Sequence, residues 1–546
     1  MSESVHLSIE GMHCDHCEIS VGAALESAGL EEVSVDWRRG EAEGRCSSGY
    51  SLQRATEEVA ELGYQVTGES APETAGKPAA AEADYDLVII GSGSAAFGAA
   101  IKARDLGATV AMIERGTVGG TCVNIGCVPS KALLRAAESY WGAGHSPFAG
   151  VETAAGAVNL KALVAQKDGL AAQLRKEKYQ DLVELYGFDL LSGDARFTGP
   201  DTIEVEGRTL RAGRFLVATG AEPWVPPIEG LDTDGYLTST DALALEQVPG
   251  ELIVVGANAI GLELGQLFLH LGSRVTFVEA LERIAPFEEP EVSQALGEHL
   301  EAQGARIYTG ATTAAAVRVE AGVTLDIAVG GDTVRLTADH LLMATGRRAR
   351  TAGLGLEAAG VDVDSRGHIV VDDQLATTNP AVYAAGDVTD HPQFVYVAAL
   401  GGNVAAENAL RGSGRAIDFT TMPRVTFTSP SIASVGLTEA AAGDAGHAVI
   451  TSVLPLEAVP RALVDWDTTG LIKLVADEAS GRLLGAHIVA DGAGDVIQAA
   501  VMALRYKATI DEIADTFHPY LTMAEGLKLA AQAFGKDVKA LSCCAA

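Results

Sequence analysis

Two strand–turn–helix patterns with glycine-rich turns constrain the fold of this chain more than any other feature. In the first, the apolar strand Y-D-L-V-I-I leads into the turn G-S-G-S-A-A, which places Gly91, Gly93 and Ala96 around the start of a helix. The next strand, T-V-A-M-I-E, ends at Glu114. Glycines in such a turn let the backbone approach a pyrophosphate at the helix N-terminus, and the acidic residue can accept hydrogen bonds from a ribose. The pattern predicts a Rossmann-like dinucleotide-binding fold.

The second pattern lies at V-V-G-A-N-A-I-G-L-E, with Gly256, Asn258 and Gly261, and its following strand ends at Glu279. Asn258 replaces the middle glycine, and because asparagine tolerates left-handed backbone angles we expect the turn to survive. Two such folds in one chain suggest a flavin and a nicotinamide. Glu279 stands where a carboxylate would bind a ribose 2′-hydroxyl and repel a 2′-phosphate, so it favours NADH or the use of both donors. The positive charge of Arg283, four residues on, would partly compensate the repulsion of the 2′-phosphate of NADPH.

Length and charge narrow the class of protein. At 546 residues the chain is too long for one core, and we expect roughly three to four domains. Its formal net charge of −34 argues against nucleic acid and anionic membranes as partners, since both select basic surfaces. The polar start and the lack of any apolar run near the roughly 18 residues that span a bilayer predict a cytoplasmic protein without membrane insertion.

The cysteines are few and clustered. Six of the seven form close pairs, namely Cys14 with Cys17, Cys122 with Cys127, and Cys543 with Cys544. A secreted disulfide scaffold would be denser and more dispersed, so the pairs indicate metal or redox chemistry. The seventh, Cys46, lies in a predicted strand, where we expect a small core residue.

The middle pair lies in G-G-T-C-V-N-I-G-C-V-P-S-K at 119–131, just after the first Rossmann-like pattern. A nearby cation such as Lys131 lowers thiol pKa values and favours the reactive thiolate. This stretch, with A-T-G at 218–220, A-T-G-R-R at 344–348 and V-Y-A-A-G-D-V at 382–388, resembles the flavin-dependent pyridine nucleotide:disulfide oxidoreductases. The resemblance covers about residues 84–546 and identifies the chain as a member of that enzyme family.

The resemblance implies FAD, NADPH or NADH, and a role for each site residue. Cys127 would be the thiolate beside the flavin and Cys122 the interchange thiol of a redox-active disulfide. Lys131 would pair with Glu263 near the flavin ring. The remaining implied cofactor-binding residues are Gly120, Thr121, Thr219, Gly220, Gly346, Arg347, Gly386 and Asp387, beside those of the two turns.

Residues 1–67 alternate strand and helix patterns in the order βαββαβ, which predicts a small ferredoxin-like unit. Its stretch G-M-H-C-D-H-C places two thiols across one turn, as a two-coordinate soft metal ion requires. The unit resembles heavy-metal-associated domains, which makes Cys14 and Cys17 metal ligands. His13 stands in place of the usual threonine, and we expect His13 and His16 to be exposed loop residues.

The closing stretch, from F-H-P-Y-L-T-M-A-E to L-S-C-C-A-A, and P-Q-F-V-Y-V-A-A at 392–399 resemble the branch of the family that reduces Hg(II). That resemblance implies a homodimer in which Cys543 and Cys544 of one subunit take Hg(II) from thiol complexes and pass it to Cys122 and Cys127 of the other. It also assigns to the site the tyrosines Tyr236 and Tyr520.

The usual acid/base dyad of the disulfide reductases is altered, because His518 and Glu525 are seven residues apart instead of five. Two alternatives remain: a thioredoxin-reductase-like enzyme whose terminal cysteines export electrons, and a thiol-based soft-metal carrier. The altered dyad argues against the first and the intact nicotinamide pattern against the second. Although Hg(II)-reducing relatives commonly prefer NADPH, Glu279 favours NADH or the use of both donors.

The predicted architecture is α/β, with two Rossmann-like domains and an α+β dimerisation domain behind the ferredoxin-like unit. The expected segments are a metal-binding domain at 1–67, a flexible linker at 68–83, an FAD-binding domain at 84–230 and 346–423, an NAD(P)-binding domain at 231–345, and a dimerisation domain at 424–546.

Overall fold

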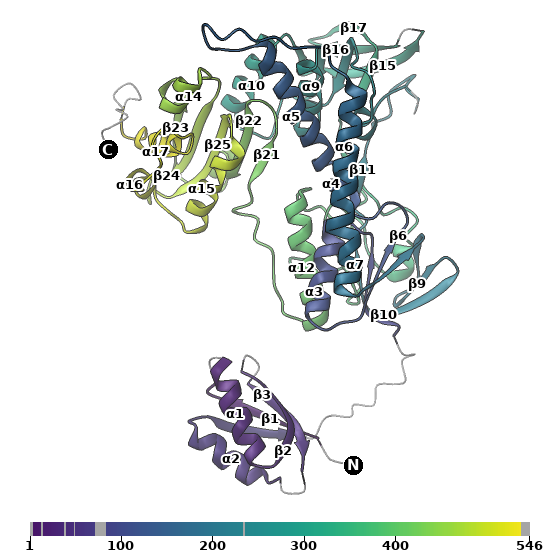
Figure 1. Ribbon diagram of the computed structural model, residues 1–546, viewed down its shortest axis with the longest axis vertical. Coiled ribbons are helices and arrows are strands. Elements are labelled where there is room, and N and C mark those ends of the chain that lie inside the picture. The colour runs from purple at the N-terminus through teal and green to yellow at the C-terminus, as the bar shows by residue number, and fades with distance from the viewer. Residues whose placement is uncertain are drawn as a thin grey trace. The chain divides into compact units, whose positions relative to one another are not determined.

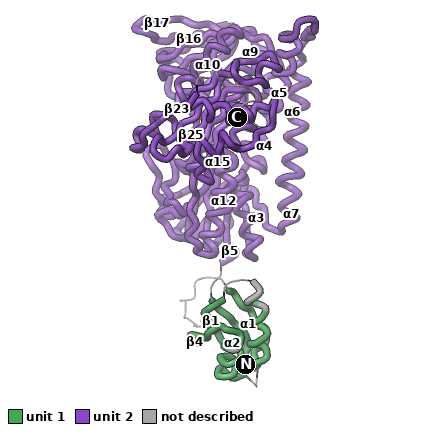
Figure 2. The backbone as a smooth tube through the Cα atoms, turned by 90° about the vertical axis from the view of Figure 1, so that its left-hand side faces the viewer, with its two compact units in different colours: residues 1–82 green, residues 83–546 purple. Residues whose placement is uncertain are grey.

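The computed structural model describes residues 4–12, 15–37, 40–47, 50–70, 83–232, 235–320 and 322–536. The chain divides into two compact units, residues 1–82 and residues 83–546, drawn green and purple in Figure 2. Within the described ranges, no helix is both long enough and apolar enough to cross a membrane.

The first unit has the predicted βαββαβ order. Its elements are β1 (Ser4–Glu10), α1 (Asp15–Ser27), β2 (Leu30–Asp36), β3 (Glu41–Cys46), α2 (Leu52–Glu61) and β4 (Gln65–Ser70). The antiparallel sheet has the strand order β2-β3-β1-β4. Alternate residues of β1, such as Leu7 and Ile9, are buried against Val21 and Leu25 of α1, as period-two strands and amphipathic helices require.

The expected start of the linker at residue 68 is wrong by three residues, because β4 continues to Ser70. Its ladder with β1 extends until Ser70 lies opposite His6. The polar sequence G-E-S gave no sign of this pairing, which depends on the length of β1.

The second unit begins with the first Rossmann-like fold (Figure 1). Its parallel strands β7, β6, β5, β10 and β20 adjoin the antiparallel strands β9 and β8. Strand β20 pairs with β10 although about 170 positions separate them, which shows that the chain returns to this fold after the second one. The strands are β5 (Tyr85–Ile90), β6 (Val110–Glu114), β7 (Asp189–Ser192), β8 (Ala195–Gly199), β9 (Thr202–Val205), β10 (Arg208–Val217) and β20 (Val382–Ala384).

Helices cover this sheet, and α12 runs along α3 beside the strand ends (Figure 1). The side chains of β5 from Leu87 to Ile90 are all buried, as in a parallel sheet covered on both faces. The helices of this part are α3 (Ser94–Asp105), α4 (Gly120–Ile125), α5 (Cys127–Gly144), α6 (Leu160–Arg175), the π-helical turn η1 (Lys176–Gln180), α7 (Asp181–Tyr186), α11 (Leu356–Ala359) and α12 (Val395–Arg411).

The second Rossmann-like fold has a four-stranded parallel sheet in the order β14-β13-β12-β18, with a three-stranded meander β15-β16-β17. The short pair β11–β19 joins it to the first fold. The elements are β11 (Ala221–Pro223), α8 (Ser239–Ala242), β12 (Glu251–Val255), α9 (Ala259–His270), β13 (Arg274–Val278), α10 (Pro290–Ala302), β14 (Arg306–Tyr308), β15 (Thr312–Val319), β16 (Gly322–Val329), β17 (Asp332–Ala338), β18 (His340–Met343) and β19 (Arg347–Ala349).

The C-terminal part is a five-stranded antiparallel sheet in the order β21-β22-β25-β24-β23, packed against helices. It confirms the predicted α+β character. The elements are β21 (Arg424–Thr426), β22 (Ser431–Gly436), α13 (Glu439–Asp444), β23 (Val449–Pro455), η2 (Leu456–Ala458), α14 (Pro460–Asp465), β24 (Leu471–Asp477), β25 (Leu483–Ala490), α15 (Ala493–Arg505), α16 (Ile510–Asp515) and α17 (Glu525–Gln532).

A buried lysine holds the C-terminal part against the second Rossmann-like fold. Lys473 of β24 is 1% exposed, and its Nζ lies 3.0 Å from Glu289, 2.9 Å from Glu291 and 2.7 Å from Glu439. Glu289, at the start of α10, is itself 2% exposed and accepts a hydrogen bond from the backbone N–H of Glu439. Removing one partner of such a buried pair leaves an uncompensated charge in a low-dielectric environment.

We predict that Lys473→Met lowers the stability of the second unit by about 3 kcal/mol, because Glu289 stays buried without its cation. The change is measured as the midpoint of thermal unfolding. The control is Arg335→Met, which breaks the exposed ion pair of Arg335 with Asp326 at 2.7 Å and leaves the midpoint in place. Equal shifts in the two variants would contradict the role of the buried lysine.

Candidate active site

The paired cysteines Cys122 and Cys127 lie on two successive helices. Cys122 is in the short α4, and Cys127 is the first residue of the 18-residue α5. Gly126 joins the helices, and the side-chain amide of Asn124 ties the segment together by donating to the carbonyls of Val118 and Gly120. A helix N-terminus favours negative charge, so this placement stabilises a thiolate at Cys127.

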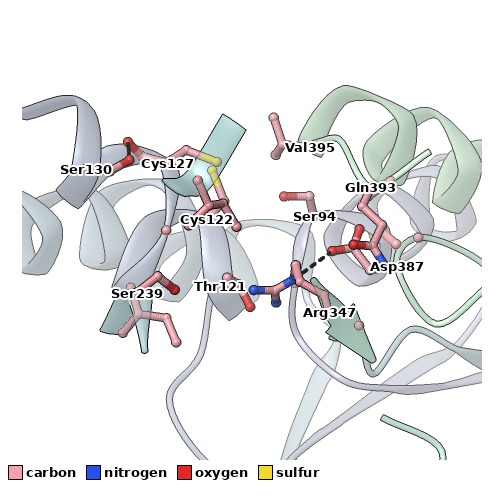
Figure 3. A pocket seen from close by; sticks show the side chains of 18 of the residues that line it. Ser94, Thr121, Cys122, Cys127, Ser130, Ser239, Arg347, Asp387, Gln393 and Val395 are labelled. Carbon is pink, nitrogen blue, oxygen red and sulfur yellow. Dashed lines mark hydrogen bonds and ion pairs between the residues drawn. The ribbon is translucent and has the colours of Figure 1, made fainter. Parts of the chain in front are cut away.

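Both cysteines are free thiols in this structure, with their sulfur atoms turned toward each other (Figure 3). The hydrogen bond from Cys122 lowers the pKa of Cys127 to about 7; burial opposes that shift and the charge of Lys131 supports it. The same hydrogen bond, together with burial, raises the pKa of Cys122. Cys127 is therefore the member of the pair that ionises first, and Cys122 stays a thiol.

The ion pair implied between Lys131 and Glu263 is present, with the Lys131 Nζ 2.6 Å from a Glu263 carboxylate oxygen. Glu263 belongs to α9 of the second fold and is 6% exposed. Its other oxygen accepts a hydrogen bond of 2.9 Å from the backbone N–H of Phe427, and the Lys131 Nζ lies 4.6 Å from the centre of the Phe427 ring. One carboxylate thus joins the cysteine helix, the second fold and the start of the C-terminal part.

The cysteines face an open pocket with about 1100 Å³ of empty space, counting the part open to solvent. The first glycine turn, α4 and α5, the start of α9 and the segments after β10 and β20 form its walls. Ser94, Thr121 and Gln393 are among the lining side chains that Figure 3 labels. Of the predicted site residues, those that line it are Gly93, Thr121, Cys122, Cys127, Gly220, Glu263, Arg347, Gly386 and Asp387.

Arg347 and Asp387 form the charged end of the pocket. The Nε of Arg347 lies 4.0 Å from Asp387, as the dashed line in Figure 3 marks, and an Nη donates a hydrogen bond of 2.6 Å to the Ala221 carbonyl. Burial raises the pKa of Asp387 and lowers that of Arg347. The two groups present a donor and an acceptor that can bind a polar chain carrying phosphates and hydroxyls.

The first turn has the backbone that a bound dinucleotide requires. Gly91 has φ +106°, and a Cβ there would lie 2.4 Å from the Ala218 carbonyl oxygen, so only glycine fits. Glu114, the last residue of β6, accepts hydrogen bonds from the Ser92 hydroxyl and from the backbone N–H of Gly116 at 2.7 Å. The N-terminus of the 12-residue α3 opens onto the pocket, and Ala96 is buried in that helix. These residues fit FAD.

The second turn is built in the same way. Gly256 has φ +95°, and a Cβ on Gly261 would lie 1.8 Å from the Gly256 carbonyl oxygen. Glu279 immediately follows β13 and accepts hydrogen bonds from the backbone N–H groups of Ala257 at 2.7 Å and Leu281 at 2.9 Å. The fold thus has the turn, the helix start and the acidic residue of a nicotinamide dinucleotide site.

The expected reason for tolerating Asn258 is wrong. Asn258 has φ −104° and ψ −169°, which is extended backbone that any residue adopts, and not a left-handed conformation. Gly93 in the first turn is likewise extended, with φ −79° and ψ −169°. The middle position of the turn therefore does not need an unusual backbone angle. A small side chain is needed there only to leave room for the ligand.

Several predicted residues lie away from the cysteine pocket. Tyr236 packs against the apolar core of the second fold and lines a separate pocket near the meander β15–β17. Tyr520 lies between α16 and α17 and is 57% exposed. The Nδ1 of His518 lies 3.0 Å from the Thr516 carbonyl, whereas Glu525 accepts from the backbone N–H of Leu521, so the two side chains of the altered dyad have different partners.

Three of the cysteines assigned to metal, Cys14, Cys543 and Cys544, lie outside the described residues, as does His13. Cys17 and His16 lie in α1, but the structure does not describe their side chains. Of the remaining predicted residues, Gly120 adjoins Gly93 of the first turn and has φ +66°. Thr219 donates a hydrogen bond to the Arg350 carbonyl, and the Gly346 carbonyl accepts one from the backbone N–H of Trp224.

Some residues of the site were not predicted. Phe427 contacts both members of the Lys131–Glu263 pair, although it is 164 positions from Glu263 and no local pattern marks it. Gln393 and Val395, which line the pocket, lie in the stretch P-Q-F-V-Y-V-A-A that supported the resemblance, so a signal for them was present.

Comparison with known proteins agrees with this geometry. The chain matches the pyridine nucleotide-disulphide oxidoreductase family over residues 85–402 and the dimerisation domain of that family over residues 422–531. It therefore belongs to the pyridine nucleotide-disulphide oxidoreductases. Among solved structures, the HOCl-induced flavoprotein disulfide reductase RclA from Escherichia coli is 30% identical with a TM-score of 0.74, covering 82% of this chain and 99% of its own.

Relatives at higher identity narrow the family. Mercuric reductase of Staphylococcus aureus is 50% identical over 543 residues, covering 99% of both chains. Mercuric reductase of Streptomyces lividans is 51% identical over 471 residues, covering 85% of this chain and 99% of its own. Within the oxidoreductase family, the chain belongs to the mercuric reductases.

We predict that Cys122→Ala raises the pKa of Cys127 from about 7 toward the ordinary thiol value of about 8.5, because it removes the hydrogen-bond donor. Alkylation of Cys127 by iodoacetamide, followed by peptide mass spectrometry against pH, measures the change. Its midpoint should move to higher pH in Cys122→Ala and stay near 7 in Cys122→Ser, which keeps a donor. An unmoved midpoint in the alanine variant would assign the low pKa to the helix and Lys131 alone.

Proposed function

We propose that this chain reduces Hg(II) to Hg(0) at Cys122 and Cys127, with electrons from a reduced nicotinamide dinucleotide. One observation supports this assignment most strongly: two free thiols, one with a pKa of about 7, face a pocket whose walls fit a flavin dinucleotide. A soft cation such as Hg(II) prefers thiolate ligands, and two facing sulfur atoms match its preference for two-coordinate binding.

The cysteine pair receives the metal in two steps. The Cys127 thiolate attacks the incoming Hg(II)–thiol complex first, because it carries the larger thiolate fraction. Cys122 then displaces the remaining external thiol and gives up its proton. A third thiolate would stabilise Hg(II) against reduction, and the described residues that line the pocket include no third cysteine. Both steps leave the metal bound by the inner pair alone.

The surrounding residues hold the pair and the cofactor in place. FAD, when bound, would relay two electrons from the nicotinamide to the Hg(II) that the cysteine pair holds. The glycine turn at Gly91 and Gly93, the start of α3, and Glu114 would hold its pyrophosphate and ribose, and Arg347 and Asp387 its polar chain. Lys131, fixed by Glu263 and Phe427, keeps a positive charge near Cys127, which favours the thiolate over the thiol.

The reaction balances as Hg(II) plus one reduced nicotinamide giving Hg(0), one oxidised nicotinamide and one proton. The nicotinamide gives up a hydride, that is, two electrons, and both electrons reach the metal. The metal leaves because neutral Hg(0) has little affinity for thiolates. Consumption of reduced nicotinamide supports the cytoplasmic location expected from the sequence.

The other two cysteine pairs deliver the metal in this proposal. Cys14 and Cys17 of the first unit bind Hg(II), and Cys543 and Cys544 transfer it to Cys122 and Cys127 of the second subunit of a homodimer. The match of residues 422–531 to a dimerisation domain supports the homodimer. Tyr520, which is 57% exposed on the same domain, and Tyr236 are both assigned to the site by family resemblance.

We predict that Cys122→Ala and Cys127→Ala each abolish Hg(II)-dependent oxidation of reduced nicotinamide while the yellow, flavin-bound protein is retained. Loss of absorbance at about 340 nm on adding HgCl₂ in excess thiol measures turnover. Cys46→Ala is the matched control: it removes a half-buried cysteine of the first unit and leaves turnover unchanged.

Parallel reactions test the alternative functions with the same protein. Oxidised thioredoxin and lipoamide replace HgCl₂ as electron acceptors. Turnover driven by these disulfides, with Hg(II) acting only as an inhibitor, would replace the proposal with a thioredoxin-reductase-like function. Full Hg(II) turnover in Cys122→Ala would remove the inner pair from the mechanism.

A further inference from the structure

The second Rossmann-like fold carries negative charge where the adenosine ribose of a nicotinamide dinucleotide must lie. In such folds the ligand binds beyond the carboxyl ends of the parallel strands, and the acidic residue after the second strand meets the 2′ position. Here that residue is Glu279, which is 7% exposed and directly follows β13. The identity of the donor therefore depends on the charges around Glu279.

The Glu279 carboxylate is fixed in position. One oxygen accepts the backbone N–H of Ala257 at 2.7 Å, within the glycine turn, and the other accepts the backbone N–H of Leu281 at 2.9 Å. Each carboxylate oxygen has a further lone pair for a ribose hydroxyl. Because both backbone bonds lock its rotamer, Glu279 cannot turn away from a 2′-phosphate as an exposed glutamate could.

The nearest cation along the chain, Arg283, is held by its own loop. Arg283, the one basic residue between 279 and 289, donates through its Nη2 to the carbonyls of Pro286 and Glu288, at 3.1 Å each. Its Nε is buried and has no hydrogen-bond partner among the described residues. These hydrogen bonds hold the guanidinium on the loop before α10, which limits how far it can reach toward a 2′-phosphate.

The other basic residues of this sheet lie at the wrong end of the strands. Arg274 begins β13 and binds Glu251 at 2.6 Å, and Arg306 begins β14. At the carboxyl ends the loop instead presents Glu282, whose carboxylate lies beside Gly310: a Cβ there would be 3.7 Å from its oxygens. Gly310 in turn donates to the Leu281 carbonyl at 2.8 Å, which fixes this loop next to Glu279.

We infer that the second fold selects NADH over NADPH, with Glu279 as the specificity-determining residue. This inference rests on the proposed nicotinamide role of the second fold. Glu279 accepts hydrogen bonds from both hydroxyls of the adenosine ribose of NADH. A 2′-phosphate would replace one hydroxyl with about two negative charges beside Glu279 and Glu282, and repulsion between these like charges weakens the binding of NADPH.

Equilibrium binding of NAD⁺ and NADP⁺ to the flavin-bound protein, measured by calorimetry without Hg(II), tests the inference apart from turnover. We expect NAD⁺ to bind at least about tenfold more tightly than NADP⁺. The ratio of kcat/KM for NADH and NADPH should follow. Tighter binding of NADP⁺ would overturn the inference and leave the proposed function intact, whereas failure to bind either nucleotide would overturn the nicotinamide role itself.

Three variants separate the charge of Glu279 from its structural contacts. Glu279→Gln removes the charge and keeps a hydrogen-bonding side chain, so the preference for NAD⁺ should fall. Leu281→Arg, at a position that is 50% exposed, should improve NADP⁺ binding further when combined with it. Arg283→Gln should leave the ratio unchanged. Selective loss of NADP⁺ binding in Arg283→Gln would show that this guanidinium reaches the 2′-phosphate.

Discussion

The site depends on one buried carboxylate, that of Glu263. It belongs to the helix that opens the second Rossmann-like fold, yet it binds Lys131 on the cysteine helix at 2.6 Å and the backbone of Phe427, at the entry to the C-terminal part, at 2.9 Å. A carboxylate that is 6% exposed is stable only with such partners. Three parts of the chain therefore meet at fixed distances around the cysteine pair, and a shift of any one would unpair a buried charge.

The surrounding charges and hydrogen bonds also explain why the two cysteines differ in pKa. Cys127 begins a long helix, accepts a hydrogen bond from Cys122 and lies near Lys131, and each of these stabilises its thiolate. Cys122 gives the hydrogen bond and has a raised pKa. Farther from the cysteines, the buried Lys473 has a structural role. It pairs with Glu289 and Glu439 and so holds the second fold and the C-terminal part in one arrangement.

The features that could be predicted from the sequence are those set by residues close together in the chain. The two glycine turns, with Glu114 and Glu279 at the strand ends, follow from a few neighbouring residues, and family resemblance supplied the pairing of Lys131 with Glu263. The contacts of Phe427 and Lys473 could not be predicted, because they join positions 164 and 184 residues apart through tertiary packing. The explanation for Asn258 failed because the turn is extended there, which a residue's identity alone does not reveal. The position of the Arg283 guanidinium likewise could not be predicted, because it is held by the carbonyls of Pro286 and Glu288 in the folded loop.

The central claim is that electrons from the nicotinamide reach mercury through the inner cysteine pair, and a mass balance tests it most directly. The protein is supplied anaerobically with a known amount of HgCl₂ in excess thiol and with limiting NADH. Volatile mercury is then swept into a trap and measured against the NADH oxidised. We predict that one Hg(0) is released for each NADH oxidised. Oxidation of NADH while all mercury stays in solution as thiol-bound Hg(II) would contradict it.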